Sequence, residues 1–257
     1  MLDITILKTA HGGDDCRQAE LRARKLIPYV QNCDTFSVES ALCTEETAKD
    51  FERIWYGVLA EPKIKRKDFL EGVEYFVKQE PNPTIRHYLR KAYEYAFRNK
   101  KPLYCAERWA DEAKAVLVGS LWVTGSNMLL SGLSSIAQGN ESEIEFARCY
   151  QGSKYMHNFI KGRDVNVGKN LARAEAIIRE TYPQLEKKDT IHLCIQIGAV
   201  HMPEIFSPLR VNDSVLVNDD YHPVEQDLVD EMMWTDVPFE DYVPIFRRIA
   251  SRLALKR

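Results

Sequence analysis

The sequence lacks any concentration of positive charge. Its 257 residues include 35 Lys and Arg against 38 Asp and Glu, which gives a formal net charge of −3, and the basic side chains are dispersed along the chain. A nucleic-acid-binding protein presents basic side chains as a patch or stripe that neutralises phosphates. We therefore expect no nucleic-acid partner.

Cysteine is sparse, and no two cysteines form a CxxC pair or a short regular repeat. Cysteines in apolar surroundings behave as small hydrophobic side chains. The beginning of the sequence also lacks the basic and then apolar pattern of a secretion signal. Together these absences favour a reducing, cytoplasmic setting for the six cysteines, which are Cys16, Cys33, Cys43, Cys105, Cys149 and Cys194.

Long apolar blocks are missing as well. A bilayer-spanning helix needs about 18 or more consecutive apolar residues. The nearest candidate, Ala115 to Asn140, has no charged side chain but is interrupted by Gly, Ser, Thr and Asn residues. We interpret it as a buried helix, a loop of small residues and a second buried helix, and we expect no membrane span.

Short apolar runs that end at a polar side chain are present. A run of this kind, rich in Ile and Leu, is typical of a strand buried on both faces in a parallel sheet. Ligands of open α/β sheets bind just beyond the carboxyl ends of such strands. Three runs end near a candidate ligand: residues 2–10 before His11, residues 35–38 before Glu39, and residues 191–198 with a following turn before His201.

Two imidazoles and a carboxylate at strand ends suit two kinds of chemistry. They are ligand types that a catalytic divalent metal uses. They also suit general acid–base catalysis without a metal. The residues alone leave both possibilities open.

Four pieces of the sequence follow one another in a recognisable order. They are Lys8-Thr9-Ala10-His11, Val38-Glu39, Gly162-Arg163-Asp164-Val165-Asn166-Val167 and Gly198-Ala199-Val200-His201. The ordered set resembles the TraB/Tiki superfamily, which includes TraB/PrgY-type proteins, Tiki proteases, ChaN-like haem-binding proteins and erythromycin esterases. The first and last pieces correspond to its two GxxH motifs, with Lys8 in the position of the first glycine.

The resemblance implies an α/β fold with a mostly parallel central sheet flanked by helices. The length fits one α/β domain over residues 1–257, with or without a helical insertion. Amphipathic patterns separated by prolines indicate a helical insertion or lid at about residues 44–100. Residues 211–217 alternate enough to form a strand or an edge hairpin. A C-terminal helical pattern covers residues 242–255.

Arg163 and Asp164 have two interpretations. The pattern predicts one helix over residues 141–160 and a second from Arg163 to residue 180, with Gly162 between them. Arg163 could then grip a substrate carboxylate or a developing oxyanion, and Asp164 could orient an imidazole. Without the resemblance, a helix N-cap at Asp164 beside a solvated Arg163 is the simpler interpretation.

A further strand candidate, residues 103–107, ends at Glu107. This carboxylate could join the other candidate ligands at the same edge of the sheet. The interpretation we favour instead is a surface cap or ion pair with Arg108.

The resemblance implies a hydrolase that acts on a peptide or a small molecule. With a divalent metal (Mn, Zn, Co or Fe), His11, Glu39 and His201 would be the ligands, the pKa of a bound water would fall toward neutrality, and Arg163 could stabilise the oxyanion. Without a metal, one histidine would be the general base and Glu39 would set its tautomer. The alternative is a non-catalytic protein that binds haem or iron, as ChaN-like proteins do, or captures a peptide, as PrgY-type proteins do.

Overall fold

The computed structural model describes residues 1–9, 24–38, 43–60, 73–74, 77, 83–198, 211–216 and 238–255. The chain forms two compact units. The first unit consists of Met1–Ala115 and Asp164–Asp219, and the second consists of Val116–Arg163 and Asp220–Arg257. The region predicted as a helical insertion, residues 44–100, belongs to the first unit.

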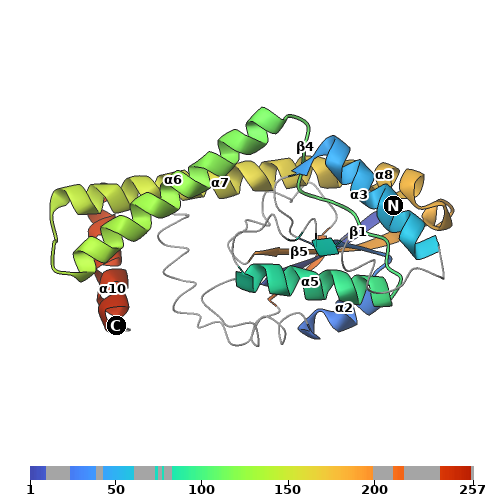
Figure 1. The fold of residues 1–257 in the computed structure, drawn as a ribbon, viewed down its shortest axis with the longest axis horizontal. Helices are drawn as coiled ribbons and strands as arrows, with labels where there is room; N and C mark the ends of the chain where they lie inside the picture. The colour runs from blue at the N-terminus through green and yellow to red at the C-terminus, as the bar shows by residue number, and fades with distance from the viewer. Residues whose placement is uncertain are drawn as a thin grey trace. The chain divides into compact units, whose positions relative to one another are not determined.

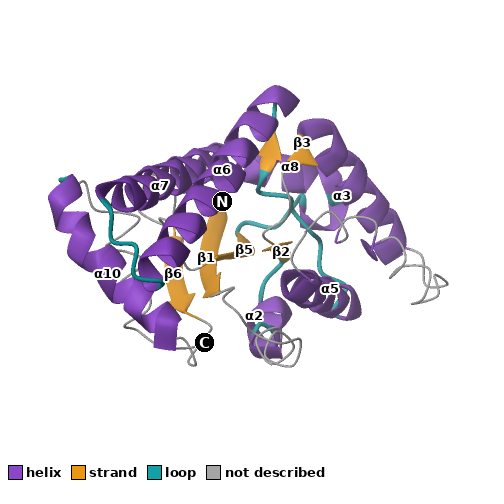
Figure 2. Cartoon of the chain, turned by 60° about the vertical axis from the view of Figure 1, so that its left-hand side comes forward, coloured by secondary structure: helices purple, strands orange, loops and turns teal. Residues whose placement is uncertain are grey.

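A four-stranded parallel sheet is the centre of the first unit, with the strand order β2-β5-β1-β6 (Figures 1 and 2). All of its pairings are parallel, so the predicted α/β class and parallel sheet are confirmed. β6 lies at one edge of the described sheet, pairs in parallel with β1 and matches the predicted strand at residues 211–217. The strands are β1 Leu2–Thr9, β2 Thr35–Val38, β5 Ile191–Gly198 and β6 Val211–Leu216.

Side chains of the central strands alternate between two apolar layers, as the two-residue period of a strand requires. Ile6 and Ile195 belong to one buried cluster, and Leu7 and Cys194 belong to the other. Figure 1 shows helices α2 and α5 on one side of the sheet and α8 on the other. Strands buried on both faces explain the continuous apolar runs in the sequence.

Two helices of the first unit, α3 and α5, match predicted amphipathic segments. α3 begins just after Thr44, whose hydroxyl accepts a hydrogen bond from Thr47 N at 3.2 Å, as an N-cap side chain does. The predicted segment between α3 and α5 lies largely outside the described residues. The helices are α2 Ile27–Asn32, α3 Glu45–Ala60, α5 Pro83–Arg98 and α8 Ala174–Thr181, followed by a 3₁₀ turn, η1 Pro183–Leu185.

The segment after α5 extends the sheet without forming a regular strand. Leu103 makes an isolated parallel bridge with Phe36 of β2, and Tyr104 N donates to Phe36 O at 3.0 Å. The chain then enters β4, Arg108–Trp109, which pairs in parallel with β3, Cys43–Thr44. The predicted strand at residues 103–107 is thus a short extension that lies beside β2.

The second unit is helical and includes most of α6, Glu112–Ala137, and α7, Glu143–Ala172, together with α10, Phe239–Leu255. The predicted C-terminal helix is confirmed by α10. Its Tyr242 ring lies 4.9 Å from the Tyr150 ring of α7, edge to face. Arg247 of α10 also donates to Glu141 at 2.7 Å.

Our prediction of a small-residue loop between two helices within residues 115–140 is wrong, because α6 is continuous. Its glycines have a packing role instead. A Cβ atom at Gly132 would lie 2.5 Å from Cys149 Sγ, and one at Gly152 of α7 would lie 2.6 Å from Leu129 N. Small residues let two helix backbones approach closely, and this close approach requires glycine at these positions.

The predicted break at Gly162 is also wrong. α7 runs through it without interruption, and the helix ends at Ala172, with α8 beginning two residues later. A Cβ atom at Gly162 would meet only Val118 side-chain atoms, at 3.6 Å and beyond. Arg163 and Asp164 are therefore in the interior of a helix, and Asp164 is not an N-cap.

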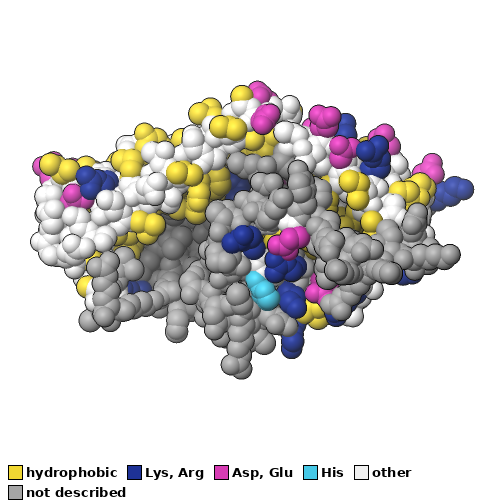
Figure 3. Space-filling model, viewed as in Figure 1, with side chains coloured by type: hydrophobic (Ala, Val, Ile, Leu, Met, Phe, Trp, Pro, Cys, Tyr) yellow, Lys and Arg dark blue, Asp and Glu magenta, His cyan; other side chains and the backbone are white. Residues whose placement is uncertain are grey.

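Helix α6 is the one helix among the described residues that is long and apolar enough to cross a membrane by length and composition. In its most apolar window, 22% of residues are buried. Its exposed apolar side chains contribute to the yellow patches in Figure 3. They are Val116, Leu117, Trp122, Val123 and Leu130.

Candidate functional site

The carboxyl ends of three neighbouring strands lie side by side in the first unit. Thr9 at the end of β1 is opposite Gly198 at the end of β5. Val38 at the end of β2 is opposite Gln196 of β5. Because all three strands are parallel, these ends form one edge of the sheet, which we call the carboxyl edge. In open α/β sheets, ligands bind at this edge.

Three of the predicted site residues follow the carboxyl edge directly in the sequence. His11 comes two residues after Thr9, Glu39 one residue after Val38, and His201 three residues after Gly198. His11, Glu39 and His201 themselves lie outside the described residues. The order and register of the described strands place Thr9, Val38 and Gly198 at one edge of the sheet.

Glu107 lies on the same side of the sheet. It follows Leu103, which is paired in parallel with Phe36 of β2, by four residues in the strand direction. Its side chain is only 2% exposed, and that of Arg108 is fully buried. The surface ion pair that we favoured from the sequence is therefore wrong, and a buried carboxylate lies toward the carboxyl edge.

Helix α7 places Asp164 toward the same edge. Asn170 Nδ2 donates to Ala106 O at 2.8 Å, whereas Tyr182, after α8, hydrogen bonds with Leu103 O at 2.6 Å. The chain from Asn170 to Tyr182 thus runs opposite to the strand direction. Asp164 precedes Asn170 by six residues, about 9 Å of helix, on the carboxyl side.

The Asp164 side chain is fully buried. It precedes the core residues Val167 and Leu171 by three and seven positions, so these three residues share one face of α7. Val167 and Leu171 belong to the apolar layer that covers the sheet. Asp164 therefore lies on the sheet-facing side of the helix, where it is a candidate to orient another side chain.

Arg163 has a different environment from that of its neighbour. Its guanidinium lies 5.2 Å above the centre of the Phe159 ring, one helical turn earlier on α7. A cation over an aromatic face is a stabilising contact of about 0.5–2 kcal/mol. This described contact holds the side chain against its own helix.

An ion-pair cluster with a buried centre, Glu52 and Arg108, was missed in the sequence. The Arg108 guanidinium contacts the Glu52 carboxylate in a very short hydrogen bond, and its Nε donates to Cys105 O at 2.8 Å. Glu52 Oε1 also accepts from Cys105 N at 2.7 Å. We call Glu45, Glu52, Arg108 and Arg173 the ion-pair cluster.

The pKa values of the two carboxylates in the ion-pair cluster shift in opposite directions. Burial raises the pKa of Glu52 to about 7, although Arg108 opposes this change. Its second oxygen is buried and has no hydrogen-bond partner among the described residues. Burial raises the pKa of Glu45, but the combined effect of Arg108 and Arg173 is larger and of opposite sign. The pKa of Glu45 is therefore below its ordinary value.

The described part of the chain contains no group of three or more His, Cys, Asp or Glu side chains that could hold a metal ion. The three predicted ligands lie outside that part. No protein-family model, no curated protein and no solved structure matches the chain.

Proposed function

We propose that the protein is a hydrolase whose reactive water is activated at the carboxyl edge by His11, Glu39 and His201. The observation that carries this proposal is the parallel pairing of β2, β5 and β1 in adjacent positions. Three segments that are far apart in the sequence thereby end next to one another. A TraB/Tiki-like version of the α/β fold is part of the same proposal.

The donor set fits a divalent metal. Two imidazoles and one carboxylate on neighbouring strand ends leave coordination positions open for water and substrate, as catalytic sites require. Mn, Zn, Co and Fe are all compatible with these ligand types. When bound, such an ion would lower the pKa of a water molecule toward neutrality.

The residues of the chain have separate roles in this proposal. His11 and His201 hold the ion or, in its absence, one of them accepts the proton of the attacking water. Glu39 supplies a carboxylate to the ion or to the second nitrogen of the imidazole. Asp164 is a positioning residue that orients an imidazole, and its burial on the sheet-facing side of α7 supports this role. The assignment of Arg163 to the developing oxyanion stays a prediction.

Hydrolysis can be tested with a panel of fluorogenic peptides and simple esters, using the wild type, His201→Ala and His192→Ala. His192 is a matched control, because it belongs to β5, the strand that leads to His201, but lies at its opposite end and is half exposed. We expect His201→Ala to lose activity and His192→Ala to retain it. Equal activity in both variants would exclude His201 from the site.

The alternative function, non-catalytic binding, gives a different result in the same proteins. A haem-binding protein would hydrolyse none of the substrates and would show a Soret band on reconstitution with haem. A peptide-capturing protein would bind peptides without cleaving them, and that binding would persist in His201→Ala. Either result would replace the hydrolase proposal.

A further inference from the structure

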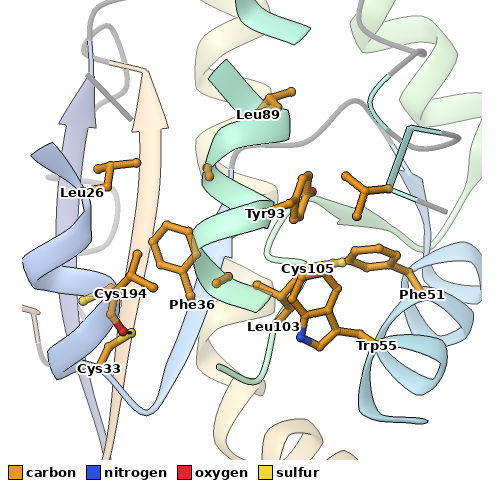
Figure 4. Close-up of a cluster of buried hydrophobic side chains, with 14 of the residues drawn as sticks. Leu26, Cys33, Phe36, Phe51, Trp55, Leu89, Tyr93, Leu103, Cys105 and Cys194 are labelled. Atoms are coloured by element: carbon orange, nitrogen blue, oxygen red, sulfur yellow. Dashed lines mark hydrogen bonds between the residues drawn. The ribbon is translucent and has the colours of Figure 1, made fainter. Parts of the chain in front are cut away.

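Two buried cysteines meet at the opposite end of the sheet from the carboxyl edge. Cys33 lies two residues before β2, and Cys194 lies in β5. Cys33 N donates to Tyr29 O at 3.0 Å, and Cys194 Sγ donates to the same oxygen at 3.8 Å. Cys33 Sγ donates to Val30 O at 3.5 Å, and the two thiols are close enough to shift each other's pKa. Figure 4 shows the two cysteines next to each other, below Leu26.

The surrounding backbone fixes the start of β2 against the start of β5. Asp34 N donates to His192 O at 2.8 Å, and His192 N donates to the Asp34 carboxylate at 2.9 Å. Cys33 and Cys194 flank this double connection, one residue before Asp34 and two residues after His192. The register pairs Cys194 with Phe36, three residues after Cys33, and the end of α2 brings Cys33 to the carbonyl that Cys194 also contacts.

The two thiols differ in acidity. The hydrogen bond with Cys194 and the positive charge of Lys101 lower the pKa of Cys33. Lys101 Nζ donates to Cys33 O at 2.6 Å. The hydrogen bond with Cys33, together with burial, raises the pKa of Cys194. Cys33 is thus the more readily ionised thiol, and the thiolate is the reactive form of cysteine.

The structure also provides a route to the buried pair. Cys33 is 2% exposed, and it is the residue that follows the six-residue helix α2. α2 has no side-chain hydrogen bond at its N-cap Leu26. Reaction at Cys33 therefore requires local opening of the chain around α2, and a helix this short is marginal by itself.

We propose that Cys33 and Cys194 are a redox-active dithiol that is converted to an intramolecular disulfide by a hydroperoxide. The Cys33 thiolate attacks one peroxide oxygen, an S–O bond forms, the O–O bond breaks, and the leaving hydroxide takes up a proton to become water. The Cys194 thiol then attacks the Cys33 sulfur. An S–S bond forms, the S–O bond breaks, and the hydroxyl leaves as a second water with the Cys194 proton.

The disulfide would connect the beginning of β2 to β5, the two strands whose other ends contribute Val38 and Gly198 to the carboxyl edge. By restraining β2 against β5, this covalent bond would make the structure of the chain respond to peroxide. This inference concerns a modification site and does not depend on the proposed hydrolase activity.

The test is thiol counting and peptide mapping on the full chain. The reduced protein is treated with hydrogen peroxide, blocked with N-ethylmaleimide and digested under non-reducing conditions. We expect the folded wild type to lose two of its six thiols and to yield one cross-linked peptide that contains Cys33 and Cys194. Dithiothreitol should reverse both changes.

Variants assign the two thiols. Cys33→Ser and Cys194→Ser should each abolish the cross-linked peptide, whereas Cys149→Ser should keep it, because Cys149 lies in α7 and burial raises its pKa to about 12. The proposal is overturned if the folded wild type keeps all six thiols, if other cysteines pair instead, or if the cross-link appears only in urea. The thiol count and the peptide map of the wild type test the proposal even if a variant fails to fold.

Discussion

Thr9 lies directly opposite Gly198 in the parallel ladder between β1 and β5. The two residues are almost 190 positions apart in the sequence, and each ends its strand. The two strands therefore end at the same edge of the sheet, and β2 adds a third strand end beside β5. The location of the proposed site depends on this register.

Two glycines of α7 should respond to alanine in opposite directions. A Cβ atom at Gly162 meets only ordinary contacts, so Gly162→Ala should stabilise a continuous helix by about 0.5–1 kcal/mol. At Gly152 the Cβ atom would lie 2.7 Å from Gly125 O and 2.6 Å from Leu129 N, so Gly152→Ala should destabilise by about 1–3 kcal/mol. Urea unfolding followed by circular dichroism measures both changes. Destabilisation by Gly162→Ala would contradict the uninterrupted helix.

Glu52 should make stability fall as the pH rises. Its folded pKa of about 7 is above the ordinary value of 4.5, so its contribution is complete below pH 4.5 and is lost through pH 7. The free energy of unfolding of the wild type, relative to Glu52→Gln, should therefore decrease by up to about 3 kcal/mol between pH 4.5 and 8. Urea unfolding at these pH values measures the difference.

Glu46 provides the control for the pH experiment, because it is an exposed carboxylate on the same helix. Glu46→Gln should show little of this pH dependence relative to the wild type. If the difference between the wild type and Glu52→Gln is constant with pH, the buried carboxyl does not titrate in this range.

Asp164 should affect the proposed site more than it affects the fold. Asp164→Asn keeps the size of the buried side chain but removes its charge, so an imidazole oriented by it would become a weaker ligand. We expect metal affinity to fall about 10–100-fold, measured by isothermal titration of the metal-free protein. Asp50→Asn, at an exposed position of α3, is the control. Unchanged affinity in Asp164→Asn would show that Asp164 has no positioning role.

The central strands could be predicted because their signal is local. Continuous apolar runs in residues 2–10 and 191–198 follow from burial on both faces, and the structure has both strands in parallel. The assignment of His11, Glu39 and His201 to one edge stays a prediction, because these residues lie outside the described part of the chain. These strands were predicted correctly because the apolar pattern of each one lies within a single segment of the sequence.

The errors concern features that depend on a second segment. Gly132 was assigned to a loop of small residues, but it lets α6 and α7 approach closely, which only the facing helix reveals. Glu52 and Arg108 likewise have no shared local pattern, since they meet only when α3 and β4 pack together. A buried pair between distant residues leaves no periodic signal in the sequence.

The most direct test of the central claim is divalent-metal content, measured by elemental analysis on protein purified without chelators. We predict near-stoichiometric Mn, Zn, Co or Fe in the wild type, lost in His11→Ala, Glu39→Ala and His201→Ala and retained in His192→Ala. That pattern would establish a shared site at the carboxyl edge. No metal in the wild type, even after incubation with these ions, or equal metal in all variants, would contradict the metal site.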